Sequence, residues 1–265
     1  MRGAALALAA SLAATIVPAA AQQAPVQTQA TTRPDARRAV LIFTKTAAFR
    51  HDSIPDAVRA LSDLAEKRGW RAVASEDSAL FTPDSLARFD VIVFASATGD
   101  LLSAEQRQAF ESWLAAGHGF VALHGAGDGS HPDWYSRMIG TGPYTGHPGG
   151  ADQFQTGNLI LLDRTHPATR HLPRRWRWTE EYYAYASPPR ADAHILARLD
   201  ETGMRFEPKQ VMGDRHALIW WRCEGRGRIF YSALGHRGET WRDPAHVRML
   251  DGALAWAGRK AGKGC

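Results

Sequence analysis

The chain has few cysteines. Only Cys223 and Cys265 occur among its 265 residues. Small secreted domains built around a disulfide framework carry many more, and the common zinc-ribbon sites need a CxxC pair, which is missing here. Because Cys265 is the last residue, we do not expect a structural disulfide between the two.

The chain also lacks a concentrated charge of one sign. It carries 32 Lys and Arg against 27 Asp and Glu, a formal net charge of +5, but the basic residues are scattered. The densest group, residues 170–177, is interleaved with His, Pro and Trp. Nucleic-acid binding requires a basic patch or stripe. We therefore interpret this segment as a solvated loop and predict no nucleic-acid partner.

Long apolar runs are absent except at the start. Residues 4–17 are apolar, follow Arg2, and lead into small residues up to Ala21. The run is shorter than a membrane span of about 20 residues, and the pattern is typical of a secretory signal peptide. We predict a signal peptide over residues 1–21, a disordered leader rich in Ala, Gln, Thr and Pro over residues 22–38, and one domain over residues 39–260. The mature protein should be periplasmic or secreted and free of the membrane.

In the first half of the domain, strand-like runs that are apolar at every position take turns along the chain with helical patterns. Strands are predicted at 39–43, 71–75, 89–95 and 119–124, with helices over about 54–65 and from the capping box of Ser103 and Gln106. Such strands are typical of a parallel sheet covered on both faces. The fold class is therefore α/β, a doubly wound, mostly parallel, flavodoxin-like sheet in a single domain.

The second half is less regular. Residues 128–189 are rich in Gly, Pro, His and aromatics, with one strand-like run at 158–162. Strands are then predicted at 194–199, 217–221 and 228–234, with a hairpin turn near residues 224–225 and a final helix starting at Asp243. An ordered loop segment of that length inside a domain is usually functional.

Three histidines follow the predicted parallel strands. His51 comes after the first strand, His124 ends the strand at 119–124, and His236 follows the strand at 228–234. Ligands of such sheets bind beyond the carboxyl ends of the strands, so we expect these side chains to share one edge. His147 and Glu181 belong to the irregular middle that should cover that edge. The alternative for each histidine alone is an ordinary surface or packed side chain.

Imidazoles at one edge allow two kinds of chemistry. One is a divalent metal site, for which zinc is favoured, with His51, His124, His147 and His236 as ligands. The other is proton transfer, with His124, Glu181 and His236 as the catalytic residues. The turn after the fourth strand resembles a nucleophile elbow, but its bend holds His124 and Gly125 rather than Ser or Cys, so covalent acyl chemistry is not expected.

Aromatic side chains accompany these segments. Flat aromatic faces stack on sugar rings, and together with His51 we predict a substrate-binding role for Trp134, Tyr144, Tyr183 and Trp241. The alternative is that these aromatics form the core of the loops.

Several motifs resemble the ThuA-like (trehalose utilisation) family, in the expected order and over nearly the whole domain. They are Phe49-Arg50-His51-Asp52-Ser53-Ile54, Ala122-Leu123-His124-Gly125-Ala126, Gly146-His147-Pro148, Glu180-Glu181-Tyr182-Tyr183 and Leu234-Gly235-His236. The resemblance implies the fold of class I glutamine amidotransferases without their cysteine. It also implies functional roles for His51, His124, His147, Glu181 and His236.

The family resemblance further implies a place in the catabolism of trehalose or related glycosides, including 3-keto-sugars. We therefore expect an isomerase, or a hydrolase or lyase, with a small sugar as its substrate. A non-catalytic carbohydrate-binding protein is the alternative hypothesis. A glutamine amidotransferase is not expected, because the elbow cysteine is missing.

Overall fold

The structure is a computed structural model that describes residues 38–259 together with Met1 and Cys265. Apart from their end residues, the predicted signal peptide and leader lie outside the described residues. None of the described helices is long and apolar enough to cross a bilayer.

A nine-stranded sheet forms the centre of the domain, in the order β2-β1-β3-β4-β11-β10-β9-β6-β7. The first five strands in this order pair in parallel, as the apolar runs predict, and 2-1-3-4 followed by a fifth strand is the flavodoxin-like arrangement. Pairing is antiparallel from β11 onward, so only β10 and β6 run against the other strands of this sheet. The strands are β1 (Ala39–Phe43), β2 (Arg71–Ser75), β3 (Val91–Ala95), β4 (Gly119–Leu123), β6 (Gln155–Leu161), β7 (Arg175–Glu180), β9 (His194–Asp200), β10 (Ala217–Glu224) and β11 (Gly227–Ser232).

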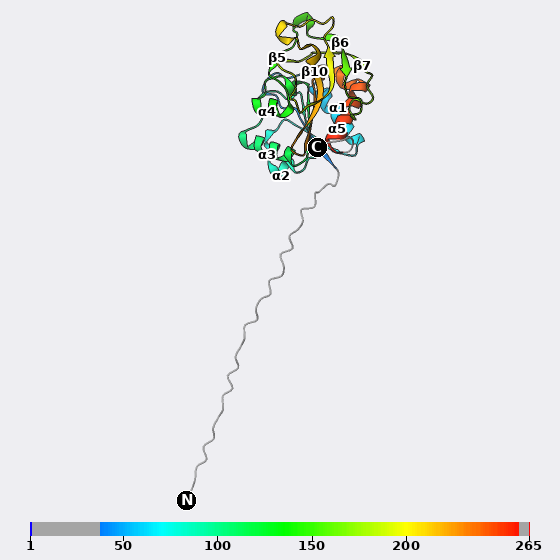
Figure 1. Ribbon diagram of the computed structural model, residues 1–265. Helices are drawn as coiled ribbons and strands as arrows, with labels where there is room; N and C mark the ends of the chain where they lie inside the picture. The colour runs from blue at the N-terminus through cyan, green and yellow to red at the C-terminus, as the bar shows by residue number, and fades with distance from the viewer. Residues whose placement is uncertain (2–37, 260–264) are drawn as a thin grey trace. The chain divides into compact units, whose positions relative to one another are not determined.

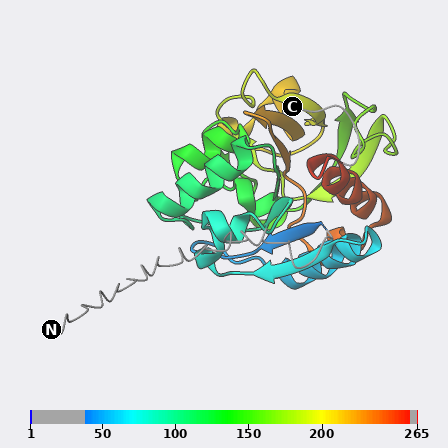
Figure 2. The ribbon, with the colours of Figure 1, turned by 90° about the horizontal axis from the view of Figure 1, so that it is seen from below.

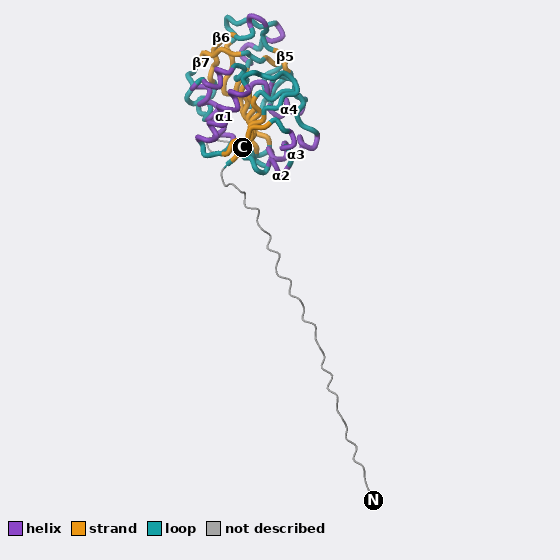
Figure 3. Tube along the Cα trace, turned by 180° about the vertical axis from the view of Figure 1, so that it is seen from behind, coloured by secondary structure: helices purple, strands orange, loops and turns teal. Residues whose placement is uncertain are grey.

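Helices cover both faces of the sheet, which confirms the doubly wound class. Helices α1 (Ile54–Lys67) and α5 (Pro244–Ala257) lie on one side, and α2 (Pro83–Leu86), α3 (Ala104–Ala115) and α4 (Asp133–Ile139) lie on the other (Figure 1). Strands β1, β3 and β4 are buried along their whole length, since both of their faces are packed (Figure 3). The predicted capping box starts α3, with the Ser103 hydroxyl accepting from the Gln106 amide.

The middle segment is more regular than the sequence reading predicts. It contains α4, the hairpin β6–β7, and a small two-stranded sheet of β5 (Tyr144–Gly146) and β8 (Ala184–Tyr185). The stretch read as a solvated basic loop contributes to β7, where Arg175 and Arg177 are exposed and Trp176 and Trp178 are buried. This alternation has the period of a half-buried strand, and the solvated-loop interpretation was wrong here.

The antiparallel half of the sheet curls back over the molecule. In a flat sheet β7 would lie about 19 Å from β11, four strand spacings away. Instead, the Glu180 carboxylate at the end of β7 accepts a hydrogen bond from the backbone of Gly235, just after β11, at 2.9 Å. Helix α5 lies within this curl, beside β6 and β7 in Figure 2, with the His246 ring 5.8 Å from Trp178. The curl therefore brings the end of β7 to the edge where β11 ends.

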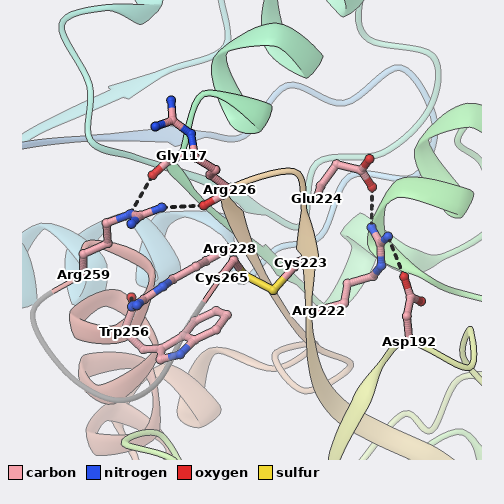
Figure 4. The surroundings of a disulfide bond; sticks show 10 residues. All are labelled: Gly117, Asp192, Arg222, Cys223, Glu224, Arg226, Arg228, Trp256, Arg259 and Cys265. Carbon is pink, nitrogen blue, oxygen red and sulfur yellow. Dashed lines mark hydrogen bonds and ion pairs between the residues drawn. A yellow bond between two sulfur atoms is a disulfide. The ribbon is translucent and has the colours of Figure 1, made fainter.

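A disulfide joins Cys223, near the end of β10, to Cys265 (Figure 4), contrary to the sequence expectation. Helix α5 ends beside the start of β4, since a Cβ on Gly119 would lie 2.4 Å from the Ala257 carbonyl oxygen. The β10–β11 turn lies at the same edge, where the guanidinium of Arg259 donates to the Arg226 carbonyl. The distance of 42 residues along the chain gives no hint of this proximity.

Candidate functional site

Four side chains meet at the carboxyl edge of the sheet. His51, His124, Glu181 and His236 each offer one metal-binding atom, and these atoms all lie within 4.8 Å of one another. The His51 ring centroid lies 4.7 Å from that of His124 and 4.9 Å from that of His236. The structure thus brings together the three histidines that follow β1, β4 and β11. Glu181 joins them because β7 also ends at this edge.

His124 occupies the bend after β4 in a left-handed conformation, with φ of 47°. Its Nδ1 donates to the Ala233 carbonyl at 2.8 Å, so that Nε2 carries the lone pair facing the cluster. The next residue must be small, since a Cβ on Gly125 would lie 2.8 Å from the His51 ring. The bend therefore positions the imidazole of His124 and leaves room for that of His51 beside it. Enzymes with a nucleophile elbow hold their nucleophile at the same place.

Glu181 links the histidines through both carboxylate oxygens. Its Oε2 lies 2.9 Å from Nδ1 of His236 and 3.6 Å from Nε2 of His124. Its Oε1 accepts from the amide of Gln153 at 2.7 Å and lies 3.3 Å from Nδ1 of His147. The side chain of Glu181 is nearly inaccessible, at 3% exposure, so these contacts take place away from bulk water.

Glu180 holds the backbone of the site. Its fully buried carboxylate accepts from the amides of Gly235, Glu181 and His236, at 2.9, 3.0 and 3.3 Å, and from the indole of Trp178 at 3.4 Å. The hydroxyl of Ser53 also donates to the Gly235 carbonyl, at 3.1 Å. The loops that carry His51, Glu181 and His236 are therefore bonded to one another behind the cluster.

Burial controls the protonation of the cluster. It lowers the pKa of His51 to about 4, with a further contribution from the neighbouring His236, and it lowers the pKa of His124. Burial alone would raise the pKa of Glu181, but hydrogen bonds from His236 and Gln153 outweigh it and leave that pKa lowered. At neutral pH the site thus combines uncharged His51 and His124 with an ionised carboxylate, the protonation states that metal binding requires.

The donor atoms of His124, Glu181 and His236 are spaced like three ligands of a tetrahedral ion such as zinc. Bonds of about 2.1 Å place tetrahedral ligands about 3.4 Å apart, and the atoms of His124, Glu181 and His236 lie 2.9, 3.2 and 3.6 Å apart in pairs. His51 also offers a ring nitrogen to this group, and its Nδ1 is buried without a hydrogen-bond partner. The bond that His124 Nδ1 donates to Ala233 orients the imidazole, and the bond that Glu181 Oε1 accepts from Gln153 orients the carboxylate, as is usual around metal ligands.

The predicted metal set differs from this cluster in one member. His147 was expected as a ligand, but the residues that meet are His51, His124, His236 and Glu181. His147 lies on the exposed side of Glu181 and donates from Nδ1 to the Pro148 carbonyl at 2.8 Å. It is one-third exposed, which leaves it accessible to a ligand.

A cavity of about 280 Å³ opens above the cluster. Two of the four aromatics predicted to bind substrate, Tyr144 and Tyr183, line it, and the Tyr183 hydroxyl lies 3.1 Å from Nε2 of His124. The lining residues are Phe49, His51, Asp128, Tyr144, His147, Gln153, Glu181, Tyr183 and His236.

The structure does not bring the two predicted tryptophans to this cavity. Trp134 packs under the guanidinium of Arg107, 4.9 Å from its ring centroid, in a separate groove. Trp241 is buried behind the site, where its indole donates to the Gly235 carbonyl at 2.9 Å. An aromatic side chain in the sequence does not by itself show whether it lines the cavity, as Tyr183 does, or packs behind it, as Trp241 does.

Sequence reasoning missed Phe49, Asp128 and Gln153, all of which line the cavity. Asp128 follows the turn after His124, and Phe49 lies two residues before His51, so proximity to the predicted histidines was a usable signal for both. Gln153 carries no such signal, since it lies beside Glu181 through the pairing of β6 with β7, in which Gln155 is opposite Glu180.

The fold and site together define a flavodoxin-like α/β protein with a histidine–carboxylate cluster at the carboxyl ends of its strands. The chain belongs to the ThuA family, described as trehalose utilisation, whose pattern matches residues 39–257. A comparison with curated proteins finds no match.

Solved structures share this fold. A ThuA-like protein from Bacteroides uniformis superposes with a TM-score of 0.69 at 20% identity, over 89% of this chain and 95% of that one. One from Parabacteroides merdae gives a TM-score of 0.62 at 21% identity, over 86% and 93%. A cytoplasmic protein from Salmonella typhimurium gives 0.52 at 11% identity, over 82% and 98%. At these identities the similarity shows the fold.

Proposed function

We propose that this protein is an exported enzyme that removes a proton next to a carbonyl group of a sugar, in the isomerisation or cleavage of trehalose-related 3-keto-glycosides. The observation that carries the proposal is the convergence of His51, His124, Glu181 and His236 beneath a cavity of about 280 Å³. The description of the family as trehalose utilisation supports the substrate class.

In this proposal the cluster holds one divalent cation, with zinc favoured by the nitrogen and carboxylate donors. The bound ion would supply positive charge next to the oxygen of an enediolate. Without it, a buried carboxylate and neutral imidazoles offer little to stabilise a developing oxyanion. The hydroxyl of Tyr183, 3.1 Å from His124, adds a neutral hydrogen-bond donor at the cavity wall.

His147 is the residue we assign to proton transfer. It lines the cavity outside the cluster, and because its Nδ1 donates to Pro148, its Nε2 is the basic atom. Nε2 takes the proton from the carbon beside the ketone, and the C–H electrons form an enolate. In an isomerisation, the proton then returns at the former carbonyl carbon, and the hydroxyl proton of the carbon that lost it passes to the former carbonyl oxygen. In a cleavage, the enolate collapses and expels the glycosidic oxygen on the β carbon, which takes up a proton.

The test separates metal binding from proton transfer. We expect about one equivalent of zinc or another divalent metal in the purified protein, lost in His51→Ala and retained in His147→Ala. In D₂O, wild type should exchange the hydrogen next to the ketone of 3-keto-trehalose, as followed by NMR, and both variants should lose this exchange. His194→Ala, at an exposed histidine at the start of β9, is the control and should match wild type.

Either of two results would contradict the proposal. One is full exchange in His147→Ala. The other is sugar binding by calorimetry with neither exchange nor product, which would instead support a non-catalytic carbohydrate-binding protein.

We also propose export to the periplasm or outside the cell. The signal-peptide pattern of residues 1–21 supports it, and the pairing of Cys223 with Cys265 suits an oxidising compartment. Mass spectrometry of the protein recovered from a periplasmic extract should find a chain that starts near Gln22. A full-length chain confined to the cytoplasm would overturn this part of the proposal.

A further inference from the structure

Phe49 is an unusual surface residue. Its side chain is 62% exposed, and it is one of few large hydrophobic residues exposed to that degree in the described part of the chain. It lies at the rim of the cavity, with its ring centroid 4.8 Å from that of His51 and 6.5 Å from that of His236. An exposed aromatic ring at the mouth of the cavity offers a flat apolar face that a ligand can cover.

The backbone around Phe49 is well anchored. Its carbonyl accepts from the hydroxyl of Thr98 at 2.7 Å, and the Thr98 carbonyl accepts from the amide of Ala47, also at 2.7 Å. A bridge between Thr46 and Thr98 joins the same two loops. The backbone that carries the ring is therefore fixed to the loop after β3.

The size of the cavity limits what can enter it. Its volume of about 280 Å³ lies at the lower end of the range for pockets that enclose small molecules, roughly 300–1,000 Å³. One sugar ring fits above the histidine cluster, and the second ring of a disaccharide must remain at the rim. Phe49 is the exposed aromatic at that rim, and an aromatic face stacks well on the C–H face of a pyranose.

We infer that Phe49 is the platform for the second, non-reacting ring of a two-ring glycoside, so that this residue makes the protein prefer disaccharides to monosaccharides. The inference rests on the proposed function for the carbohydrate class of the ligand. It adds the number of rings and the residue that recognises the outer one.

The test is calorimetric titration with 3-keto-trehalose and with 3-keto-glucose in a His147→Ala background, which removes the proposed turnover, so that each variant is compared with a protein that is otherwise wild type. Phe49→Ala should weaken disaccharide binding about tenfold, the loss expected for one stacked ring, and change monosaccharide binding by less than about twofold. Phe49→Trp should restore disaccharide binding. Leu162→Ala removes a side chain of similar exposure, 54%, in a different groove, and should bind both sugars as wild type does.

The outcomes separate this inference from the proposed reaction, because binding is measured without turnover. If wild type binds the disaccharide but neither sugar is converted, the reaction fails while the ratio of the two affinities still decides the role of Phe49. Equal weakening of both sugars by Phe49→Ala would overturn the inference, because the ring would then act by supporting His51. No effect on either sugar, or no binding of either sugar to wild type, would overturn it too.

Discussion

Replacing Glu180 by Gln should damage both stability and activity, although Glu180 does not line the cavity. The substitution preserves the shape of the side chain but turns one of two acceptor oxygens into a donor. Oε1 accepts from the amides of Glu181 and His236, and Oε2 from the amide of Gly235 and the indole of Trp178. Whichever way the amide turns, two buried N–H groups lose their acceptor.

The magnitude follows from these bonds. Each buried donor left without a partner costs about 1–3 kcal/mol, hence about 2–6 kcal/mol for the pair. Part of this is offset, because burial raises the pKa of Glu180, which means that ionised Glu180 carries a desolvation cost that the amide avoids. We expect Glu180→Gln to lower the free energy of unfolding by about 2–4 kcal/mol and Tm by roughly 4–16 °C.

The assay combines chemical denaturation with metal content and turnover. Glu111→Gln is the control, since Glu111 is a half-exposed partner of Arg107 and should contribute less than about 1 kcal/mol. Glu180→Gln should also lower metal occupancy and the exchange rate, because either the amide of His236 or that of the adjacent Gly235 loses its acceptor. A Glu180→Gln protein with wild-type stability, metal content and exchange rate would refute the idea that this carboxylate positions the site.

Cys265→Ser should lower the free energy of unfolding by about 2–4 kcal/mol in urea titrations without reductant, since the Cys223–Cys265 disulfide closes a loop of 42 residues; equal stability would show that the bond does not form. Burial lowers the pKa of His246 to about 4, from 6.5 in the unfolded chain, so its contribution to stability is complete above pH 6.5 and is lost as pH falls through 4. His246→Phe should remove about 3 kcal/mol of that acid sensitivity, and an unchanged pH profile of unfolding would contradict the assignment. Tyr183→Phe should slow exchange about tenfold by removing a hydroxyl beside the cluster, whereas Trp134→Ala should leave the exchange rate unchanged. A normal rate in Tyr183→Phe together with a slowed rate in Trp134→Ala would restore Trp134 as a site residue.

The parallel half of the fold was predictable because its signals are local. Buried runs such as Val91–Ala95, the cap at Ser103 and the stop at Gly117 each depend on residues close in sequence. The topology then placed His51, His124 and His236 at one edge, since parallel strands all end on the same side. These three positions therefore followed from the order of the elements.

The antiparallel half was not predictable in the same way. The alternation of Arg and Trp in β7 is a strand signal, but it was masked by the density of positive charge in residues 170–177. The pairing of β7 with β6, and the curl that returns its end to β11, depend on contacts between residues far apart in the chain.

By itself the sequence determined the α/β class, the family motifs and the three histidines that follow parallel strands, because hydrophobic period and strand order are written in neighbouring residues. Only the tertiary structure decided that Glu181, and not His147, completes the cluster, that Tyr183 faces the cavity while Trp241 supports it, and that Cys223 meets Cys265. Each of these outcomes depends on how the sheet curls and how side chains pack from different strands, and no local pattern carries that information.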